Sequence, residues 1–538
     1  MFADYDKPNS PGCAVGVYRD DRMVYTRGYG LADLERQVPI TSRTVFDIGS
    51  TSKQFTAAVI VLLAQEGKLS LDDDVRKHIA ELPAYERPIT IRQLLNHTSG
   101  LRDYIGLLLL SGRRFDDVTT SDDALRLLTQ QRALNFTPGA EHLYSNSGYF
   151  LLSLIVERVT GKSLREEAQS RIFTPLGMRS SQLLGGYDEV LPNRALAYER
   201  RGGGYRHDLP RWMQLGDGAV FTTVEDLLRW DQNFYTPAVG GRAMVDSMLV
   251  RGRLNDGKEL DYALGLIHER FRGQRAVSHG GAWGGYRAEL LRFPEQHYSV
   301  AVLCNLASSD PSALARGVAA VHLGAVLEPV AKSVASAPAT SGAASASPAM
   351  VVPEATLRRY VGTYRQVGGS NLATLVVADG QLRVTVPGAF TLRADSDREF
   401  TVIGAPFSAR LRLELPTGDT APATRLTWQF PNQPDMVFAR VDAESMGAVN
   451  LVEFAGTYRS EELDGVLWRL TASNGALVAS FPGDEGMSLR AIGRDEFGGG
   501  GTTMRFVRNA TGAVVEAFLS QGRMRNIRFN RVDGSTSR

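Results

Sequence analysis

Ser50 and Lys53 form the first pattern in the chain that could do chemistry, because a serine needs an adjacent base to act as a nucleophile. The tetrad Ser50-Thr51-Ser52-Lys53 follows a strand-like segment, residues 44–49, and opens a long apolar helical segment that ends at Gly67. A serine there has its hydroxyl near free backbone N–H groups. The lysine three residues later lies on the same helix face. Apolar neighbours can desolvate it and present a neutral amine to the serine. The alternative is that Ser50 caps the helix and Lys53 is solvated.

Tyr144-Ser145-Asn146 is a second candidate, placed between a loop signal at residues 136–139 and an apolar helical segment that starts at Tyr149. A tyrosine in such a loop can take or give the proton of a nucleophile, and the asparagine can hydrogen-bond a substrate carbonyl. The other reading is that both are ordinary turn and surface residues. The Tyr-x-Asn pattern occurs once in the chain, as does Ser-x-x-Lys.

His279-Gly280-Gly281 is the third candidate, and it precedes another glycine pair in Trp283-Gly284-Gly285. Glycines at these positions let a backbone edge come close to a ligand. A second His-x-Gly pattern, His322-Leu323-Gly324, lies in an apolar helical stretch and is interpreted as structural.

In this order the three motifs resemble those of the penicillin-recognising serine hydrolases, which include class C β-lactamases, DD-peptidases, D-aminopeptidases and related esterases. Three further segments are typical of that family: IRQLLNHTSGL (91–101), FTPGAEHLYSNSG (136–148) and GGYRAELLRFPE (284–295). The resemblance covers about residues 10–325. It implies an α+β catalytic domain, with an antiparallel sheet packed between helices.

The resemblance also implies a role for each motif residue. Ser50 is expected to be the nucleophile, Lys53 its proton acceptor, and Tyr144 the residue that completes the proton relay. Asn146 is expected to hold the substrate amide, and the backbone N–H groups of Ser50 and Ala282 to form the oxyanion hole. The full expectation comprises the catalytic residues Ser50, Lys53, Tyr144 and His279 and the substrate-binding residues Asn146, Gly281 and Ala282.

His279 stands where β-lactamases and carboxypeptidases of this family have a lysine. Histidine is mostly neutral near pH 7, so it anchors a substrate carboxylate less well than a permanent cation does. We therefore expect a small amide or peptide substrate and a D-stereospecific aminopeptidase or amidase activity. The alternatives are an esterase or weak β-lactamase on the same scaffold, or a penicillin-binding sensor that is acylated without turnover.

The elements that must position these residues come from both ends of the first 330 residues. Strand signals at residues 13–30, with a turn at Asp20-Asp21, return at residues 260–305, with helical patterns between them. Such an order predicts an α+β arrangement in which early and late strands share one sheet. We expect a catalytic domain at residues 1–330 and an Ala/Ser/Pro-rich linker at residues 331–352.

Beyond the linker the sequence repeats itself. Gly-Thr-Tyr-Arg occurs at residues 362–365 and again at 456–459, and each copy closes with Phe-x-Arg-Val, at 438–441 and 529–532. Both copies alternate apolar and polar residues, which predicts two small antiparallel, lipocalin-like β-barrels at residues 353–447 and 448–538. This arrangement is similar to that of bacterial D-aminopeptidases. The glycine-rich segment Phe497–Thr503 is hypothesised to be a mobile loop that reaches the catalytic pocket, or else a hairpin tip.

Composition excludes several other classes of protein. With 60 basic and 59 acidic residues the net charge is +1, which gives no reason to expect nucleic acid as a partner. We expect no membrane span and no cofactor or metal, and a homodimer is a further expectation. Cys13 and Cys304 lie in apolar strand-like runs and favour buried free thiols over a bridge. Residues 1–11 are polar, which fits a cytosolic protein or a mature exported form.

Overall fold

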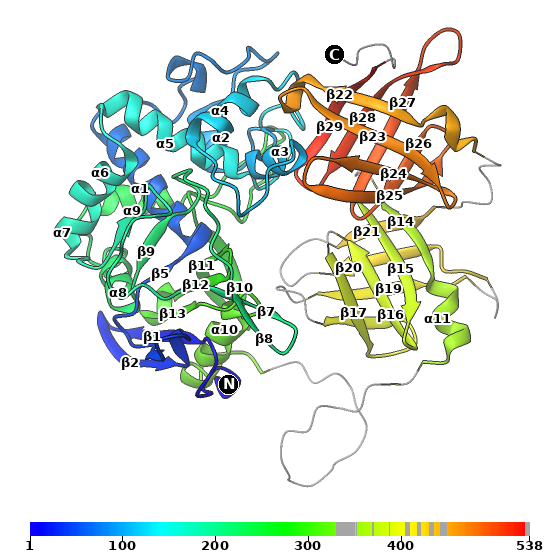
Figure 1. The fold of residues 1–538 in the computed structure, drawn as a ribbon. Coiled ribbons are helices and arrows are strands. Elements are labelled where there is room, and N and C mark those ends of the chain that lie inside the picture. The colour runs from blue at the N-terminus through cyan, green and yellow to red at the C-terminus, as the bar shows by residue number, and fades with distance from the viewer. Residues whose placement is uncertain are drawn as a thin grey trace. The chain divides into compact units, whose positions relative to one another are not determined.

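The computed structural model in Figure 1 describes residues 1–329, 350, 352–367, 371–386, 388–403, 409–416, 421–429, 435–441 and 449–532. Its contacts divide the chain into two compact units. The first unit consists of residues 1–108 and 114–329, and the second comprises the rest of the chain. All three candidate motifs lie in the first unit.

A six-stranded antiparallel sheet forms the centre of the first unit, with the strand order β10-β11-β12-β13-β1-β2. Strands from both ends of the unit therefore share one sheet, as the sequence predicts (Figure 1). Its strands are β1 (Cys13–Arg19), β2 (Arg22–Tyr29), β10 (Ile267–Phe271), β11 (Gln274–Trp283), β12 (Tyr286–Phe293) and β13 (Tyr298–Cys304).

Helices pack on this sheet from both sides. Helix α10 contacts β12 and β13, and its apolar residues join Val15, Val302 and Leu291 in one buried cluster. Helix α8 contacts β1 and β13, where the Tyr18 hydroxyl donates to the carbonyl of Val224 at 2.6 Å. The helices within residues 1–329 are α1 (Lys53–Gln65), α2 (Ile91–Leu95), α3 (Tyr104–Leu110), α4 (Ser121–Thr129), α5 (Asn146–Thr160), α6 (Leu164–Ala168), α7 (Thr174–Leu176), α8 (Val224–Gln232), α9 (Gly241–Leu249) and α10 (Pro311–His322).

The predicted hairpin at residues 13–30 is present. Asp20 and Asp21 connect β1 and β2 with φ angles of +48° and +62°. A two-residue turn with positive φ at both positions matches the twist of the strands that it joins. Shorter strands complete the unit: β3 (Leu31–Asp33) with β4 (Val38–Pro39), β7 (Tyr198–Arg201) with β8 (Gly204–His207), and β5 (Phe46–Asp47) with β9 (Val220–Thr222) and β6 (Gln182–Leu183).

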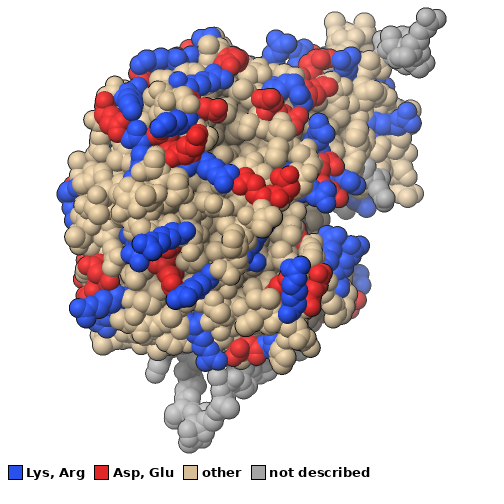
Figure 2. Space-filling view, turned by 60° about the vertical axis from the view of Figure 1, so that its left-hand side comes forward, with Lys and Arg blue, Asp and Glu red and all other residues tan. Residues whose placement is uncertain are grey.

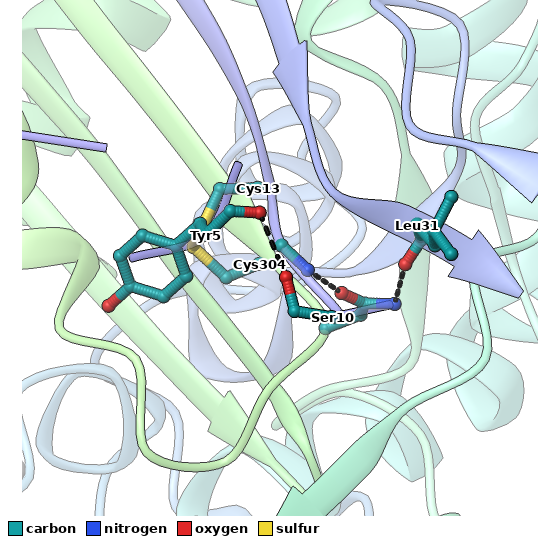
Figure 3. The surroundings of a disulfide bond; sticks show 7 residues. Tyr5, Ser10, Cys13, Leu31 and Cys304 are labelled. Atoms are coloured by element: carbon teal, nitrogen blue, oxygen red, sulfur yellow. Dashed lines mark hydrogen bonds between the residues drawn. A yellow bond between two sulfur atoms is a disulfide. The ribbon is translucent and has the colours of Figure 1, made fainter. Parts of the chain in front are cut away.

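The cysteine prediction was wrong, because Cys13 and Cys304 form a disulfide (Figure 3). They are direct partners in the antiparallel pair of β1 and β13, and their Cα atoms lie 4.0 Å apart. Directly opposed residues of neighbouring strands are close enough for such a bond. Two apolar runs 291 residues apart do not reveal this register. Beside the bridge, Asn305 accepts from the Gly12 N–H and donates to the Leu31 carbonyl.

The second unit contains two closed eight-stranded antiparallel barrels, which confirms the predicted fold class. A short helix, α11 (Glu354–Tyr360), precedes the first barrel. The first barrel consists of β14 (Gly362–Gln366), β15 (Leu372–Ala378), β16 (Gln381–Val386), β17 (Gly388–Ala394), β18 (Glu399–Ile403), β19 (Arg410–Glu414), β20 (Arg425–Gln429) and β21 (Met436–Arg440). The second consists of β22 (Gly456–Ser460), β23 (Val466–Ser473), β24 (Ala476–Phe481), β25 (Asp484–Gly493), β26 (Glu496–Gly499), β27 (Thr502–Arg508), β28 (Val514–Gln521) and β29 (Met524–Val532).

The sequence repeat has a physical basis that is the same in both barrels. The Tyr364 hydroxyl donates to the carbonyl four residues before it at 2.8 Å, and the Tyr458 hydroxyl does the same at 2.9 Å. An arginine of the last strand, Arg440 or Arg531, donates to the carbonyl just before the first strand. The repeated tyrosine and arginine therefore tie the start of each barrel to its end.

The glycine-rich segment Phe497–Thr503 is a β-hairpin of the second barrel and not a long loop. Residues of β26 and β27 pair on either side of a turn at Gly500-Gly501, and Phe497 is buried in the barrel interior. The predicted linker lies outside the described residues, apart from its last residues Met350 and Val352.

Acidic and basic side chains alternate over the face shown in Figure 2, as expected for a chain with almost no net charge. Among the helices that the structure describes, none has both the length and the apolar character needed to cross a bilayer.

Candidate active site

Ser50 lies in a single 3-10 turn, Gly49–Ser52, that leads directly into α1, and Lys53 is the first residue of that helix. The Lys53 side chain is fully buried. Its Nζ lies 3.1 Å from Ser50 Oγ, 3.0 Å from Asn146 Oδ1 and 2.7 Å from the Asp217 carbonyl oxygen. Three oxygens at hydrogen-bond distance hold the amine beside the serine hydroxyl, which is the relation that a base and its nucleophile need.

Asn146 opens helix α5, and Asp103 fixes its orientation. The Asp103 carboxylate accepts from the backbone N–H of Asn146 at 2.8 Å and from its side-chain Nδ2 at 3.0 Å. Because the carboxylate can only accept, the amide nitrogen faces Asp103 and the amide oxygen faces Lys53. The side chain of Asn146 is therefore locked with its acceptor beside the lysine.

Tyr144 lies beside Lys53 and in contact with His97. The Lys53 Nζ is 5.0 Å from the centre of the Tyr144 ring, and the His97 ring centre is 4.1 Å from it. The His97 Nδ1 accepts from the N–H of Ser145, which holds the loop that carries the tyrosine. His97 follows α2, whose N-terminus is closed by a capping box between Thr90 and Gln93.

His279 projects from β11 and is 3% exposed. Its Nδ1 lies 2.7 Å from the Gly280 carbonyl oxygen and its Nε2 3.0 Å from the Tyr262 hydroxyl. A carbonyl oxygen cannot donate, so Nδ1 carries the proton and Nε2 accepts from Tyr262. Burial, reinforced by the nearby Lys53 charge, lowers the pKa of His279 to about 3. The imidazole is therefore neutral at physiological pH.

Two glycines let the nucleophile turn approach β11 closely. A Cβ at Gly281 would lie 1.8 Å from the Ile48 carbonyl oxygen, and a Cβ at Gly49, where φ is +50°, would lie 2.6 Å from the Ala282 nitrogen. No side chain fits at either position. The glycines thus bring the backbone of residues 49–50 against that of residues 281–282, and the N–H groups of Ser50 and Ala282 lie in this contact region.

A cleft of about 770 Å³, part of it open solvent, contains Ser50, Asn146 and Ala282 among its lining residues. Its lining also includes two acidic side chains, Asp47 and Asp217. Burial raises the pKa of Asp47 to about 7, although its hydrogen bond from the Gly49 N–H and the charge of Arg194 oppose the rise. Burial likewise raises the pKa of Asp217 to about 6, against the opposing charge of Lys53. The other residues that line the cleft are Gly49, Tyr104, Ile105, Leu184, Gly186, Tyr187, Arg194, Leu209, Pro210, Trp212, Gln214, Gly218, Ala219, Phe221, Trp283 and Tyr286.

The structure thus brings all seven predicted site residues into one region, and it adds residues that the motifs do not include. Asp103 and Tyr262 hold Asn146 and His279, and Asp217 places a carboxylate in the cleft. A sequence signal exists only for Asp217, which stands between two glycines in Gly216-Asp217-Gly218. The partners of Asp103 and Tyr262 depend on long-range folding. Within the described residues, no group of three or more His, Cys, Asp or Glu side chains is arranged to hold a metal ion.

Comparison with known proteins finds the family profile described as Beta-lactamase, which matches residues 1–325. The chain is 28% identical over 480 residues to a D-aminopeptidase of Gluconobacter oxydans, an alignment that covers 88% of this chain and 84% of that protein. It is 32% identical over 300 residues to a D-aminopeptidase of Brucella anthropi, which covers 55% of this chain and 56% of that protein. This second match therefore spans little more than half of that relative.

Among solved structures, the fold is similar to that of an octameric penicillin-binding protein homologue from Pyrococcus abyssi. The TM-score is 0.55 at 24% identity, with 80% of this chain and 96% of that chain covered. At this level of identity the likeness concerns the fold.

Proposed function

The chain belongs to the β-lactamase family, and from this premise we propose that it is a serine hydrolase with D-stereospecific aminopeptidase or amidase activity. The proposal is supported by its similarity, over 84% of the length of that relative, to a protein named D-aminopeptidase. The two barrels of the second unit are in keeping with that similarity, because the alignment covers 88% of this chain.

One observation carries the proposal: the Lys53 amine lies 3.1 Å from Ser50 Oγ and is held there by two further oxygens. In the proposed first step, the neutral amine takes the hydroxyl proton while Oγ attacks the substrate carbonyl carbon. The carbonyl oxygen becomes an oxyanion that accepts from the backbone N–H groups of Ser50 and Ala282.

Collapse of this intermediate breaks the amide bond and leaves an ester on Ser50. The leaving amine takes a proton through Tyr144, whose ring lies beside Lys53. A water molecule then attacks the ester with the same groups as base and acid, which releases the carboxylic acid and restores the serine. Asn146 binds the substrate amide throughout, because Asp103 fixes its side chain.

His279 disfavours the binding of a substrate that has a carboxylate beside the scissile bond. Its pKa of about 3 keeps the imidazole neutral, and both ring nitrogens already have partners. We therefore propose that the recognised end of the substrate is not anionic.

A panel of four substrates tests the proposal: the D- and L-alanine p-nitroanilides, p-nitrophenyl acetate and nitrocefin. Turnover of D-alanine p-nitroanilide that clearly exceeds turnover of the L-enantiomer is expected. Preferential hydrolysis of p-nitrophenyl acetate or of nitrocefin, without turnover of the anilide, would instead support the esterase or the weak β-lactamase. Stoichiometric, long-lived acylation by a β-lactam without product release would support a sensor.

We also propose that residues 1–330 form the catalytic domain, followed by a linker at 331–352 and barrels at 353–447 and 448–538. Limited proteolysis is expected to cut first between residues 331 and 352. The expected homodimer is tested by light scattering coupled to size-exclusion chromatography, where a monomer or a larger assembly contradicts it.

A further inference from the structure

Asp217 is one of two acidic side chains in the cleft that the proposed reaction does not use. Its side chain is 8% exposed and lines the same cleft as Ser50. Within the described part of the chain its carboxylate forms no salt bridge, and its hydrogen-bond donor is the Tyr104 hydroxyl, 3.1 and 3.3 Å from the two oxygens. A carboxylate has about four lone-pair positions, so one hydroxyl leaves capacity for another donor.

The backbone around Asp217 is fixed by contacts with α1. The Thr56 hydroxyl donates to the Gly216 carbonyl at 2.7 Å, and Lys53 donates to the Asp217 carbonyl. Gly216 has a φ of +104°, and a Cβ there would lie 2.2 Å from the Tyr149 carbonyl oxygen. Only glycine fits this bend. The carboxylate is therefore presented by a rigid segment that contacts the catalytic lysine.

We propose that Asp217 binds the protonated α-amino group of the substrate, an inference that rests on the proposed aminopeptidase function. In an amino acid amide, the amino nitrogen is two bonds from the carbonyl carbon that Ser50 attacks. The Lys53 Nζ lies within hydrogen-bond distance of both Ser50 Oγ and the backbone carbonyl of Asp217, so the backbone of residue 217 lies near the nucleophile. A buried carboxylate in the same cleft as the nucleophile can form a charge-assisted hydrogen bond with such an ammonium group.

Asp47 is the other acidic residue of the cleft and is less suited to this role. Its Oδ1 already accepts from the Gly49 N–H at 2.7 Å, and the positive charge of Arg194 acts on it. Asp47 therefore offers a matched control, with the same type of side chain in the same cleft.

The test compares two esters that differ only in the amino group, D-alanine benzyl ester and benzyl propanoate. Benzyl alcohol release gives kcat/KM for each, and their ratio is the amine preference. We expect the wild-type enzyme to prefer the amino ester and Asp217→Asn to reduce that preference at least about tenfold, mainly through KM. Asp47→Asn should change the preference less than about threefold, and Tyr104→Phe, which keeps the carboxylate, should retain most of it.

The pH profile gives a second readout. Four ionisable groups interact with the Asp217 carboxylate. They are Lys53 at the start of α1, Tyr104 at the start of α3, Asp103 in the residue before α3, and Asp47 at the end of β5. KM for the amino ester is expected to fall as the pH rises through about 6 and Asp217 ionises, and Asp217→Asn should abolish this dependence.

Three results would overturn the inference: no amine preference in the wild type, equal losses on both esters in Asp217→Asn, or an equal loss of preference in Asp47→Asn. Failure of the proposed function is distinguishable, because it appears as absent turnover of D-alanine p-nitroanilide. The ester ratio still measures ammonium recognition in that case.

Discussion

The active site has two sides that treat charge in opposite ways. On the Lys53 side, Lys53, Asp103, Asn146 and Asp217 form a chain of hydrogen bonds that contains ionisable groups of both signs. On the His279 side, the imidazole lies between the Tyr262 hydroxyl and the Gly280 carbonyl and is neutral. We expect proton transfer on the first side, whereas the second side adds no charge to the site.

The largest expected effect is on the Lys53 side. Lys53→Ala removes the base beside Ser50, and kcat/KM for D-alanine p-nitroanilide should fall by about 10³-fold or more. Lys258→Ala, at an exposed position, is the matched control and should leave the rate as it is. Steady-state kinetics measure both variants, and near-UV circular dichroism checks that Lys53→Ala is folded. A loss smaller than tenfold in the folded variant would remove the base from the mechanism.

Asp47 provides the next test, through stability. Because burial raises the pKa of Asp47 to about 7, the folded protein holds this proton more tightly than the unfolded chain does. The resulting contribution to stability is present below about pH 4 and is lost as the pH rises to about 7. Asp47→Asn should therefore reduce the fall in unfolding free energy between pH 5 and pH 8 by about 2 kcal/mol.

Denaturant unfolding at the two pH values measures this difference. The variant Asp256→Asn is a suitable control, since the side chain of Asp256 is exposed at the surface. An unchanged pH dependence in Asp47→Asn would mean that Asp47 is ionised in the folded protein without cost.

A smaller effect is expected on the His279 side. Tyr262→Phe removes the donor to His279 Nε2 but keeps the ring, so kcat/KM should fall less than about tenfold, as for loss of one neutral hydrogen bond. The shape of the pH–rate profile should stay the same, because no charged group is lost. A new ionisation in the profile would show that Tyr262 controls the protonation of His279.

The smallest expected effect is that His279 does not titrate near neutral pH. Nitrogen NMR of 15N-histidine-labelled protein should show His279 with a proton on Nδ1 and no titration between pH 5 and pH 8. Comparison with a His279→Gln sample assigns the resonance among the eight histidines. Titration of His279 near pH 6.5 would contradict this, because the imidazole would then become a cation within the physiological pH range.

The features that the sequence could predict are those that depend on local or periodic patterns. Ser50 and Lys53 are three residues apart at a helix start, so helical geometry alone places them together. Their relation to Asn146 and His279 follows from the order of family motifs, and the barrels follow from a repeat with alternating polarity. These features are local or periodic, and both kinds of pattern are visible in a single chain.

What could not be predicted depends on long-range register and burial. The bridge between Cys13 and Cys304 requires that β1 lie opposite β13. The neutrality of His279 is set by burial and by the nearby Lys53 charge, and its Nε2 accepts from the hydroxyl of Tyr262, seventeen residues away on another segment. The carboxylate of Asp217 enters the cleft only because the bend at Gly216 packs against α5 and α1.

The most direct test of the central claim is to trap the acyl-enzyme. The enzyme is quenched in acid during turnover of D-alanine benzyl ester, digested and analysed by peptide mass spectrometry. The account predicts a D-alanyl ester on Ser50, and neither adduct nor turnover in folded Ser50→Ala. An adduct on another residue, or turnover that persists in Ser50→Ala, would contradict it.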